Sequence, residues 1–270
     1  MLLINRKNKM SEEDFIRRVA VIIPAFNEEA RIGAVLRVAA STPLVSEVIV
    51  VDDGSSDKTA SVARRFNVRT ETLPRNVGKG GAMLHGALCA TGADVIVFLD
   101  ADLIGLHPEH IEALAYPVVS GESSMAIGQF VGGRGVTDLA QFLVKCISGQ
   151  RAIERDLFLS IPSVDTVGYG VEMLITLHVS AQKLRTKVVT LRGVTHPMKE
   201  EKLGFAKGVI ARAHMYLQMG RFWAWYHLRP TPPVSVEHLS EMRDEGNVVV
   251  GNGSSQDKTV DAVQNAPMAR

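Results

Sequence analysis

Two aspartates separated by one residue, Asp100-Ala101-Asp102, directly follow the apolar run Asp94–Leu99 (DVIVFL). Because this run predicts a strand buried on both faces, we expect both carboxylates at the strand's carboxyl end. Paired carboxylates can bind hard divalent cations, and such a cation assists the departure of a diphosphate. His196, after another predicted strand, is a candidate third ligand. The alternatives are one capping and one solvated aspartate, and a surface histidine.

Polar residues also follow two earlier predicted strands. Pro24–Glu29 (PAFNEE) comes after the run Val19–Pro24, and Asp52–Ser55 comes after the run Glu47–Val51. Ligands of open parallel sheets bind beyond the carboxyl ends of the strands. Carboxylates accept hydrogen bonds from imide N–H and hydroxyl groups, so these segments suit recognition of a base and a ribose. An aspartate at one strand end is commonly a turn or cap residue, but the recurrence at three ends favours a nucleotide site.

A glycine-rich segment, Gly78-Lys79-Gly80-Gly81, opens a predicted helix. It is not a Walker A loop, because no Ser or Thr follows the lysine and the spacing differs. Backbone N–H groups at the helix start, together with the Lys79 ammonium, could still hold a phosphate or a base. A turn followed by a solvated lysine is the alternative.

The elements that must position these residues alternate in type along the first hundred residues. Helices over Glu28–Ala40, Asp57–Phe66 (capped by Ser55 or Ser56) and Gly80–Ala90 separate the strands, which include Val68–Leu73. This alternation predicts an α/β fold with a parallel sheet. Further along we expect helices over Pro108–Tyr116, Thr137–Ser148, Val171–Leu184 and Phe205–His227, and strands over Ser124–Val131 and Lys187–Leu191.

Composition excludes several classes of protein. The chain has 270 residues, a net charge of +1 and 46% hydrophobic residues, which argues against collagen-like, coiled-coil and disordered proteins. No apolar run reaches the roughly 18–20 residues that span a bilayer. The first residues predict no secretory signal, and the two cysteines indicate no disulfide framework. We expect a cytoplasmic protein that binds no nucleic acid.

The near-zero net charge conceals a basic block. Residues 183–229 carry ten basic and two acidic side chains, a net charge of +8, between an acidic body and an acidic tail. Since this block surrounds His196, it could attract an anionic acceptor or an anionic membrane surface, although a solvated basic face is the alternative. The aromatic segment Met215–Leu228 could pack on the core, dip into a membrane interface or contact a second copy in a homodimer.

Four motifs follow one another over residues 19–103: VIIPAFNEE, VVDDGSSDKT, RNVGKGGAM and VFLDADL. In this order they resemble the nucleotide-sugar half of family-2-type glycosyltransferases with the GT-A fold. Downstream, GGRGVTDL, SGQRAIERDLF, VGYGVEM and THPM are similar to the acceptor half of glucosyl-3-phosphoglycerate synthases. Polyprenyl-phosphate sugar transferases share the first half.

The resemblance implies one GT-A domain over residues 19–229, with a Rossmann-like, mostly parallel sheet flanked by helices. Residues 19–103 would form the nucleotide-sugar half and residues 104–229 the acceptor half. An N-terminal arm over residues 1–18 would precede this domain. A mobile tail over residues 230–270 would follow it, in keeping with its Pro, Gly and Ser content.

The resemblance also implies a role for each matching residue. The nucleotide and its phosphates would be bound by Pro24, Ala25, Phe26, Glu28, Asp53, Lys79, Asp100 and Ala101. Mg²⁺ or Mn²⁺ would be held by Asp102 as the more direct ligand, with Asp100 and His196. The acceptor would lie against Gly133, Arg134, Thr137, Gln150 and Arg151. Glu172 would face the sugar as the first candidate for a catalytic base, with Asp165 as the second.

The reaction implied is transfer of a hexosyl group from a UDP- or GDP-linked sugar to an anionic, phosphorylated acceptor such as phosphoglycerate. Transfer to a polyprenyl phosphate at the membrane surface stays open, since Asp53 matches the lipid-phosphate enzymes where phosphoglycerate enzymes tend to have serine. The loop GGRGVT is also one residue longer than the phosphoglycerate pattern. A third alternative is an inert module that binds nucleotide sugars, against which the intact Asp100, Asp102 and His196 set argues.

Overall fold

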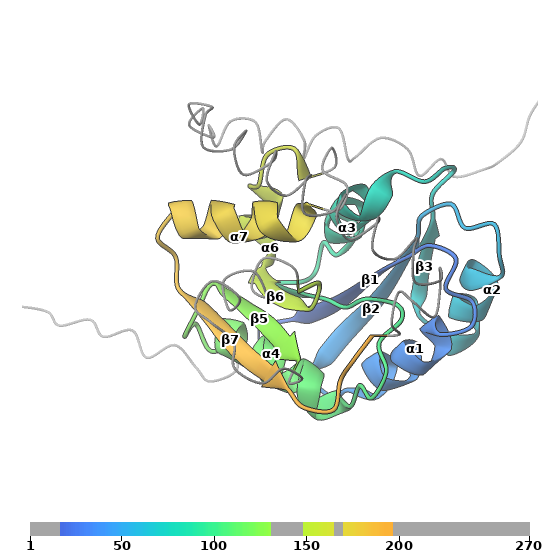
Figure 1. Ribbon diagram of the computed structural model, residues 1–270, viewed down its shortest axis with the longest axis horizontal. Helices are drawn as coiled ribbons and strands as arrows, with labels where there is room; N and C mark the ends of the chain where they lie inside the picture. Colours follow the sequence, from blue (N-terminus) through green and yellow to red (C-terminus); the bar gives the residue numbers. More distant parts are fainter. Residues whose placement is uncertain (1–16, 131–147, 165–169, 197–270) are drawn as a thin grey trace, which may run out of the picture. The chain divides into compact units, whose positions relative to one another are not determined.

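A seven-stranded sheet organises the residues that the computed structural model describes, which are 17–130, 148–164 and 170–196 (Figure 1). The chain divides into two units, Met1–Thr231 and Pro232–Arg270, and every described residue belongs to the first. The strands are β1 (Val19–Ala25), β2 (Val45–Asp52), β3 (Arg69–Thr72), β4 (Val95–Phe98), β5 (Met125–Phe130), β6 (Arg151–Glu154) and β7 (Thr186–Leu191).

The order of the strands across the sheet is β3-β2-β1-β4-β6-β5-β7. Within the described residues, β6 alone runs antiparallel to its neighbours β4 and β5, and the other strands share one direction. The carboxyl ends of β1, β2, β4 and β7 therefore lie at one edge of the sheet. This mostly parallel sheet confirms the predicted fold class.

Helices cover both faces of the sheet. They are α1 (Ile32–Ser41), α2 (Thr59–Ala63), which continues as a 3₁₀ turn over Arg64–Phe66, α3 (Gly78–Cys89), α4 (Pro108–Val119), α6 (Arg155–Leu159) and α7 (Val171–Ala181). Figure 1 shows α3, α6 and α7 on one side of the sheet and α1, α2 and α4 on the other. Two separate apolar cores result, one beneath α1 and α4 and one beneath α3, α6 and α7.

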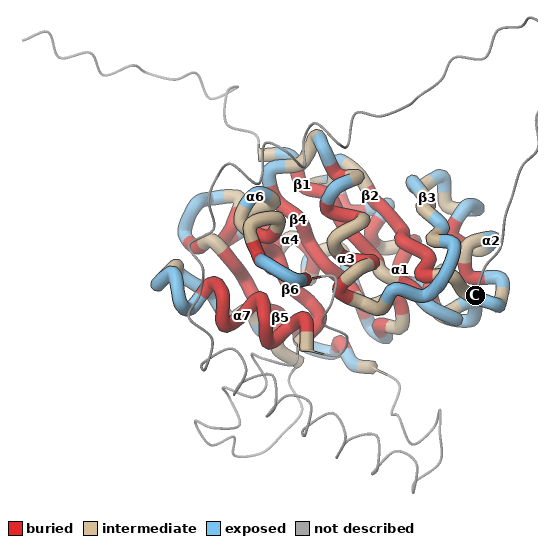
Figure 2. Tube along the Cα trace, turned by 90° about the horizontal axis from the view of Figure 1, so that it is seen from above, coloured by how far each residue is buried: buried red, intermediate tan, exposed pale blue. Residues whose placement is uncertain are grey.

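The central strands are buried because they are continuous runs of apolar, mostly β-branched residues. All four residues of β4 are buried, as are Val48–Asp52 of β2, and Figure 2 shows this buried centre in red. Helix α1 buries Ile32, Val35, Leu36 and Ala39, which recur at helical spacing as predicted. Because the apolar runs of β2 and β4 are buried, these strands keep their positions, and so do the polar residues that follow them.

Most predicted elements are confirmed, with boundaries that differ by a few residues. The predicted cap at Ser55 or Ser56 is wrong, because the helix begins at Thr59 and the Ser55 hydroxyl instead accepts a hydrogen bond from the Asn27 N–H. Helix α7 is buried from Val171 to Val179.

Several predictions lie outside the described residues. They are the helices Thr137–Ser148, of which only the last residue is described, and Phe205–His227, together with most of the arm 1–18 and the whole tail 230–270. The domain boundaries stay predictions. Within the described parts of the chain, no helix is long and apolar enough to cross a membrane.

Candidate active site

The carboxyl edge of the sheet brings Asp100, Asp102 and His196 together. Their ligand atoms lie within 4.8 Å of one another. The Nδ1 atom of His196 is 3.2 Å from Oδ1 of Asp102, and its Nε2 atom is 3.6 Å from Oδ2 of Asp100. Two carboxylates and one imidazole suit Mg²⁺ or Mn²⁺ with positions left for other ligands. The predicted metal-ligand set is therefore adjacent in space.

A short antiparallel bridge between Ile104 and Thr195 brings His196 to the aspartates. Its two backbone hydrogen bonds measure 2.9 and 3.0 Å. Gly105 next to the bridge has a φ of +74°, and a Cβ there would lie 2.2 Å from the carbonyl oxygen of Gly193. A glycine is needed for this approach. The Phe130 ring packs edge-on against the imidazole with a centroid separation of 4.9 Å, which restrains its orientation.

Lys79 links Asp100 to helix α7 through Glu172. Its Nζ atom lies 2.6 Å from Oδ1 of Asp100 and 2.6 Å from Oε1 of Glu172. Burial disfavours its charge, yet these two carboxylates raise the pKa of the ammonium above its usual value. Likewise burial disfavours ionised Asp100, but Lys79, then His196, keep the pKa of this carboxyl below its usual value. Both groups are therefore charged at neutral pH.

Gly149 permits this close grouping, and sequence reasoning missed it. A Cβ at this position would lie 2.6 and 2.7 Å from the carboxylate oxygens of Asp100 and 2.7 Å from Nζ of Lys79. Any side chain would therefore displace the ion pair. The residue reaches the site because β6 is antiparallel to β4, with Arg151 opposite Phe98, so the start of β6 meets the end of β4. The SGQR segment alone carried no signal of that pairing.

Gln150 and Arg151 have different positions although they are neighbours. Gln150 donates a hydrogen bond from Nε2 to Oδ2 of Asp100 at 2.8 Å, which places its amide in the site. Arg151 is fully buried beneath it and donates to the Ser148 carbonyl at 2.9 Å and to the Thr176 hydroxyl at 2.8 Å. Arg151 is thus held among other residues of the chain, and its contact with an acceptor stays a prediction.

Asp53 is buried and binds backbone of its own chain. Its Oδ1 and Oδ2 atoms accept hydrogen bonds from the N–H groups of Val77 at 2.7 Å and Gly78 at 3.0 Å. Burial raises the pKa of this carboxyl, and the two hydrogen bonds oppose that rise. Asp53 therefore holds the start of α3, which carries Lys79. Sequence reasoning placed Asp53 at the base and did not foresee this support.

The segment predicted to meet the base and ribose is fastened to the loop after β2. The Asn27 amide oxygen accepts from the Ser56 N–H at 2.9 Å, and the Glu28 N–H donates to the Thr59 hydroxyl at 2.8 Å. Phe26 keeps 46% of its surface exposed at this edge, a large apolar side chain in a position to stack on a ligand. Pro24 and Ala25 end β1 beside it. Ala101 is buried between the two aspartates.

The basic block is not gathered around His196 within the described residues. Arg185 precedes β7 and Lys187 is its second residue, so both lie at the opposite end of this strand from His196. There Lys187 pairs with Glu122, and Arg185 donates to the Gly121 carbonyl at 3.5 Å. Arg192 follows β7 on the site's side. The basic residues of the block that the structure describes thus lie at both ends of β7.

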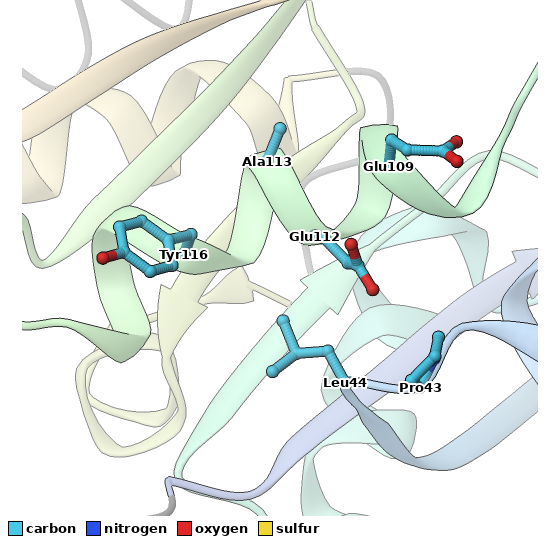
Figure 3. A pocket seen from close by; sticks show the side chains of 6 residues that line it. All are labelled: Pro43, Leu44, Glu109, Glu112, Ala113 and Tyr116. Atoms are coloured by element: carbon cyan, nitrogen blue, oxygen red, sulfur yellow. The ribbon is translucent and has the colours of Figure 1, made fainter.

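Four predicted site residues lie outside the described residues: Gly133, Arg134, Thr137 and Asp165. Elsewhere, a hollow of about 660 Å³ lies between α4 and the start of β2, lined by Pro43, Leu44, Glu109, Glu112, Ala113 and Tyr116 (Figure 3). It contains none of the predicted site residues. Its two carboxylates would repel a diphosphate, so it does not compete with the sheet edge as a nucleotide site.

Fold and site together define a GT-A type nucleotide-sugar transferase architecture: a mostly parallel sheet with an Asp-x-Asp pair at its carboxyl edge. The family model "Glycosyl transferase family 2" matches residues 20–167. The chain belongs to this family.

Several of the similar proteins are glucosyl-3-phosphoglycerate synthases. The enzyme of Mycobacterium tuberculosis is 34% identical over 197 residues, which cover 58% of this chain and 59% of that enzyme. The enzyme of Petrotoga mobilis is 27% identical over 220 residues, covering 67% of this chain and 66% of that enzyme. The chain therefore spans 59% of the length of the M. tuberculosis relative.

A crystal structure of the M. tuberculosis enzyme in complex with Mn²⁺, UDP and phosphoglyceric acid is similar in fold. It superposes with a TM-score of 0.59 at 31% identity, covering 74% of this chain and 78% of that chain. Another structure of that enzyme holds Mg²⁺ and UDP, with a TM-score of 0.60 and 29% identity over 76% of this chain and 80% of that chain.

Proposed function

We propose that this chain transfers a hexosyl group from a nucleoside diphosphate sugar, UDP- or GDP-linked, to an anionic, phosphorylated acceptor such as phosphoglycerate. The observation that carries the proposal is the convergence of Asp100, Asp102 and His196 with the Lys79–Glu172 ion pair. The M. tuberculosis enzyme, which has been crystallised with Mn²⁺, UDP-glucose and phosphoglyceric acid, supports a UDP-linked donor and this acceptor.

Asp102, His196 and Asp100 would hold Mg²⁺ or Mn²⁺, which would neutralise negative charge on a departing diphosphate. The donor set fits such an ion because it is rich in carboxylate oxygens. Both oxygens of Asp100 already accept hydrogen bonds, from Lys79 at 2.6 Å and from Gln150 at 2.8 Å. These partners fix the orientation of that carboxylate before any ligand arrives.

Lys79 contributes a fixed positive charge beside the diphosphate position. Its ammonium is held by Asp100 and Glu172, so it need not reorganise as negative charge develops on the leaving group. Preorganised charge of this kind is the main means by which such sites lower a barrier. The role is therefore electrostatic, in keeping with the prediction that the Lys79 ammonium holds a phosphate.

Glu172 is the carboxylate that we assign to the sugar side of the site. Its side chain is only 10% exposed, and it is held 2.6 Å from the Lys79 ammonium by its place in the first turn of α7. A base must come within hydrogen-bond reach of the acceptor hydroxyl, and Glu172 lies at the edge where the acceptor half meets the aspartates. Asp165 stays the second candidate.

The test is a transfer assay on the full chain with UDP-glucose or GDP-glucose, 3-phosphoglycerate and Mn²⁺. We expect a glycosylated phosphoglycerate whose formation stops with chelator and in the Asp102→Ala variant. A product formed only with polyprenyl phosphate in vesicles would replace the proposal with the membrane transferase. Nucleotide-sugar binding without turnover on either acceptor would favour the inert module.

The cytoplasmic location, peripheral membrane contact and homodimer formation stay predictions from the sequence. Co-sedimentation with anionic vesicles at low and high salt would test the membrane contact, because attraction to anionic lipid weakens as salt screens it. Sedimentation equilibrium of the full chain would test the homodimer.

A further inference from the structure

Three potential metal ligands gather on the face of α3 that lies toward the edge strand β3, away from the active site. Glu71 comes from β3, and His85 and Cys89 come from α3. One ligand atom of each lies within 4.8 Å of the others. Because His85 and Cys89 are four residues apart on a helix, their side chains share one face. Nothing in the proposed transfer reaction uses these three residues.

The chain holds this cluster together through contacts that require no metal. Arg69 donates from Nε to Oε1 of Glu71 at 2.8 Å and from Nη1 to the Cys89 carbonyl at 2.9 Å. These bonds fasten the edge strand to the end of α3. The other carboxylate oxygen, Oε2 of Glu71, faces Nε2 of His85 at 3.8 Å. The carboxylate thus presents one oxygen to the arginine and one to the cluster.

We propose that Glu71, His85 and Cys89 form a Zn²⁺ site, with water as the fourth ligand. Thiolate, imidazole and carboxylate are the ligands that Zn²⁺ takes in proteins, commonly in tetrahedral geometry. A thiolate also discriminates against Mg²⁺ and Mn²⁺, which prefer oxygen. The site is therefore chemically distinct from the oxygen-rich set at Asp100 and Asp102. Side-chain exposures of 39% for His85 and 31% for Glu71 leave a path for the ion.

The charges around the cluster balance when Zn²⁺ is bound. Arg69 contributes one positive charge, while Glu71 and Glu47, 3.7 Å from its guanidinium, contribute two negative charges. The Cys89 thiolate adds a third negative charge, so the three negative charges equal the charge of Arg69 and the ion together. A cysteine binds the ion as its thiolate, so binding releases the thiol proton.

Bound Zn²⁺ would tie the sheet edge to the helix that begins beside Lys79. The unfolded chain does not bring the three ligands together. The ion therefore binds the folded chain preferentially and raises its melting temperature. At a free concentration 100 times the Kd, the expected rise in Tm is about 5–10 °C. Metal binding here would therefore stabilise the nucleotide-sugar half of the domain without touching its reaction.

The experiment is a Co²⁺ titration of chelator-treated full chain in a Cys146→Ser background, which leaves Cys89 as the only thiol. We expect a thiolate-to-cobalt charge-transfer band that saturates at one equivalent and disappears on adding Zn²⁺. Cys89→Ser should abolish the band. His85→Ala and Glu71→Gln should each weaken Co²⁺ binding more than about tenfold. Proton release on Zn²⁺ addition gives a second readout.

Two controls separate this site from its surroundings. Glu47→Gln removes a carboxylate that contacts the same arginine but is no ligand, and should change the affinity less than about fivefold. Asp102→Asn, in the active site, should leave the band unchanged. The proposal is overturned if no band forms, if the band survives Cys89→Ser, or if Asp102→Asn removes it. Apo-protein melting curves verify that each variant folds.

Discussion

The substitution Gly149→Ala tests whether the site depends on the present positions of Asp100 and Lys79. The added Cβ would lie 2.6 Å from Oδ2 of Asp100, so restoring ordinary contact at 3.4 Å requires a displacement of about 0.8 Å. A misplacement of about 1 Å at reacting groups costs on the order of 100-fold in rate. Gly149 does not have a positive φ, so alanine can adopt its backbone conformation and the free energy of unfolding should change little. We therefore expect kcat/KM to fall on the order of 100-fold with nearly unchanged Tm.

The assay combines steady-state glycosyl transfer with Mn²⁺ titration followed by electron paramagnetic resonance, because the shifted Asp100 should also weaken the metal. Gly92→Ala is the matched control: its Cβ would meet the Arg18 guanidinium at 3.5 Å, an ordinary contact far from the site. Wild-type kcat/KM and Mn²⁺ affinity in Gly149→Ala would refute the reasoning, since the side chain would then fit without moving the pair.

Three further predictions concern groups that hold the site. Lys79→Met should raise the pKa of Asp100. In the folded wild type the lowered pKa of Asp100 stabilises the fold above the ordinary pKa of this group, and that contribution is lost as pH falls, so the variant should have a lower Tm at neutral pH and a smaller fall in Tm on the acid side. An unchanged Tm–pH profile would contradict this. Asp53→Asn leaves one of the two N–H groups at the start of α3 facing an NH₂ group and should lower the free energy of unfolding by about 1–3 kcal/mol in urea denaturation. Gly105→Ala places a side chain at a φ of +74°, with its Cβ 2.2 Å from the Gly193 carbonyl oxygen. It should lower the free energy of unfolding by at least about 1–2 kcal/mol and weaken Mn²⁺ binding, because the bridge that positions His196 is disturbed. Retained Mn²⁺ affinity would show that the bridge does not position the histidine.

The parallel half of the sheet was predictable from the sequence because it depends on local pattern. The apolar runs that became β1, β2 and β4 are short, continuous and followed by polar residues, and parallel strands bring such ends to one edge. Asp100 and Asp102 share one loop, so their proximity needed no tertiary information. His196 was placed beside them through the family resemblance, and the structure confirms the contact.

Residues that meet through pairing of distant segments were harder to predict. The four residues of β6 (RAIE) show neither alternation nor a continuous apolar run, so this strand and its antiparallel pairing with β4 were missed. Gly149 was missed with it. Arg151 has the residue type of an acceptor ligand, but its full burial depends on Thr176 and Ser148 around it. The structure describes only part of the basic block, and there Arg185 and Lys187 lie at the end of β7 opposite His196, since closeness along a strand is not closeness in space.

The antiparallel ladder between β4 and β6 also determines which residues surround Asp100. Phe98 pairs with Arg151, and this register alone sets Gln150 beside Asp100. A shift by one residue would turn every side chain of β6 to the other face and remove that contact. The same register brings Gly149 beside Asp100 and Lys79. One ladder thus decides both the amide that donates to the Asp100 carboxylate and the space that the ion pair occupies.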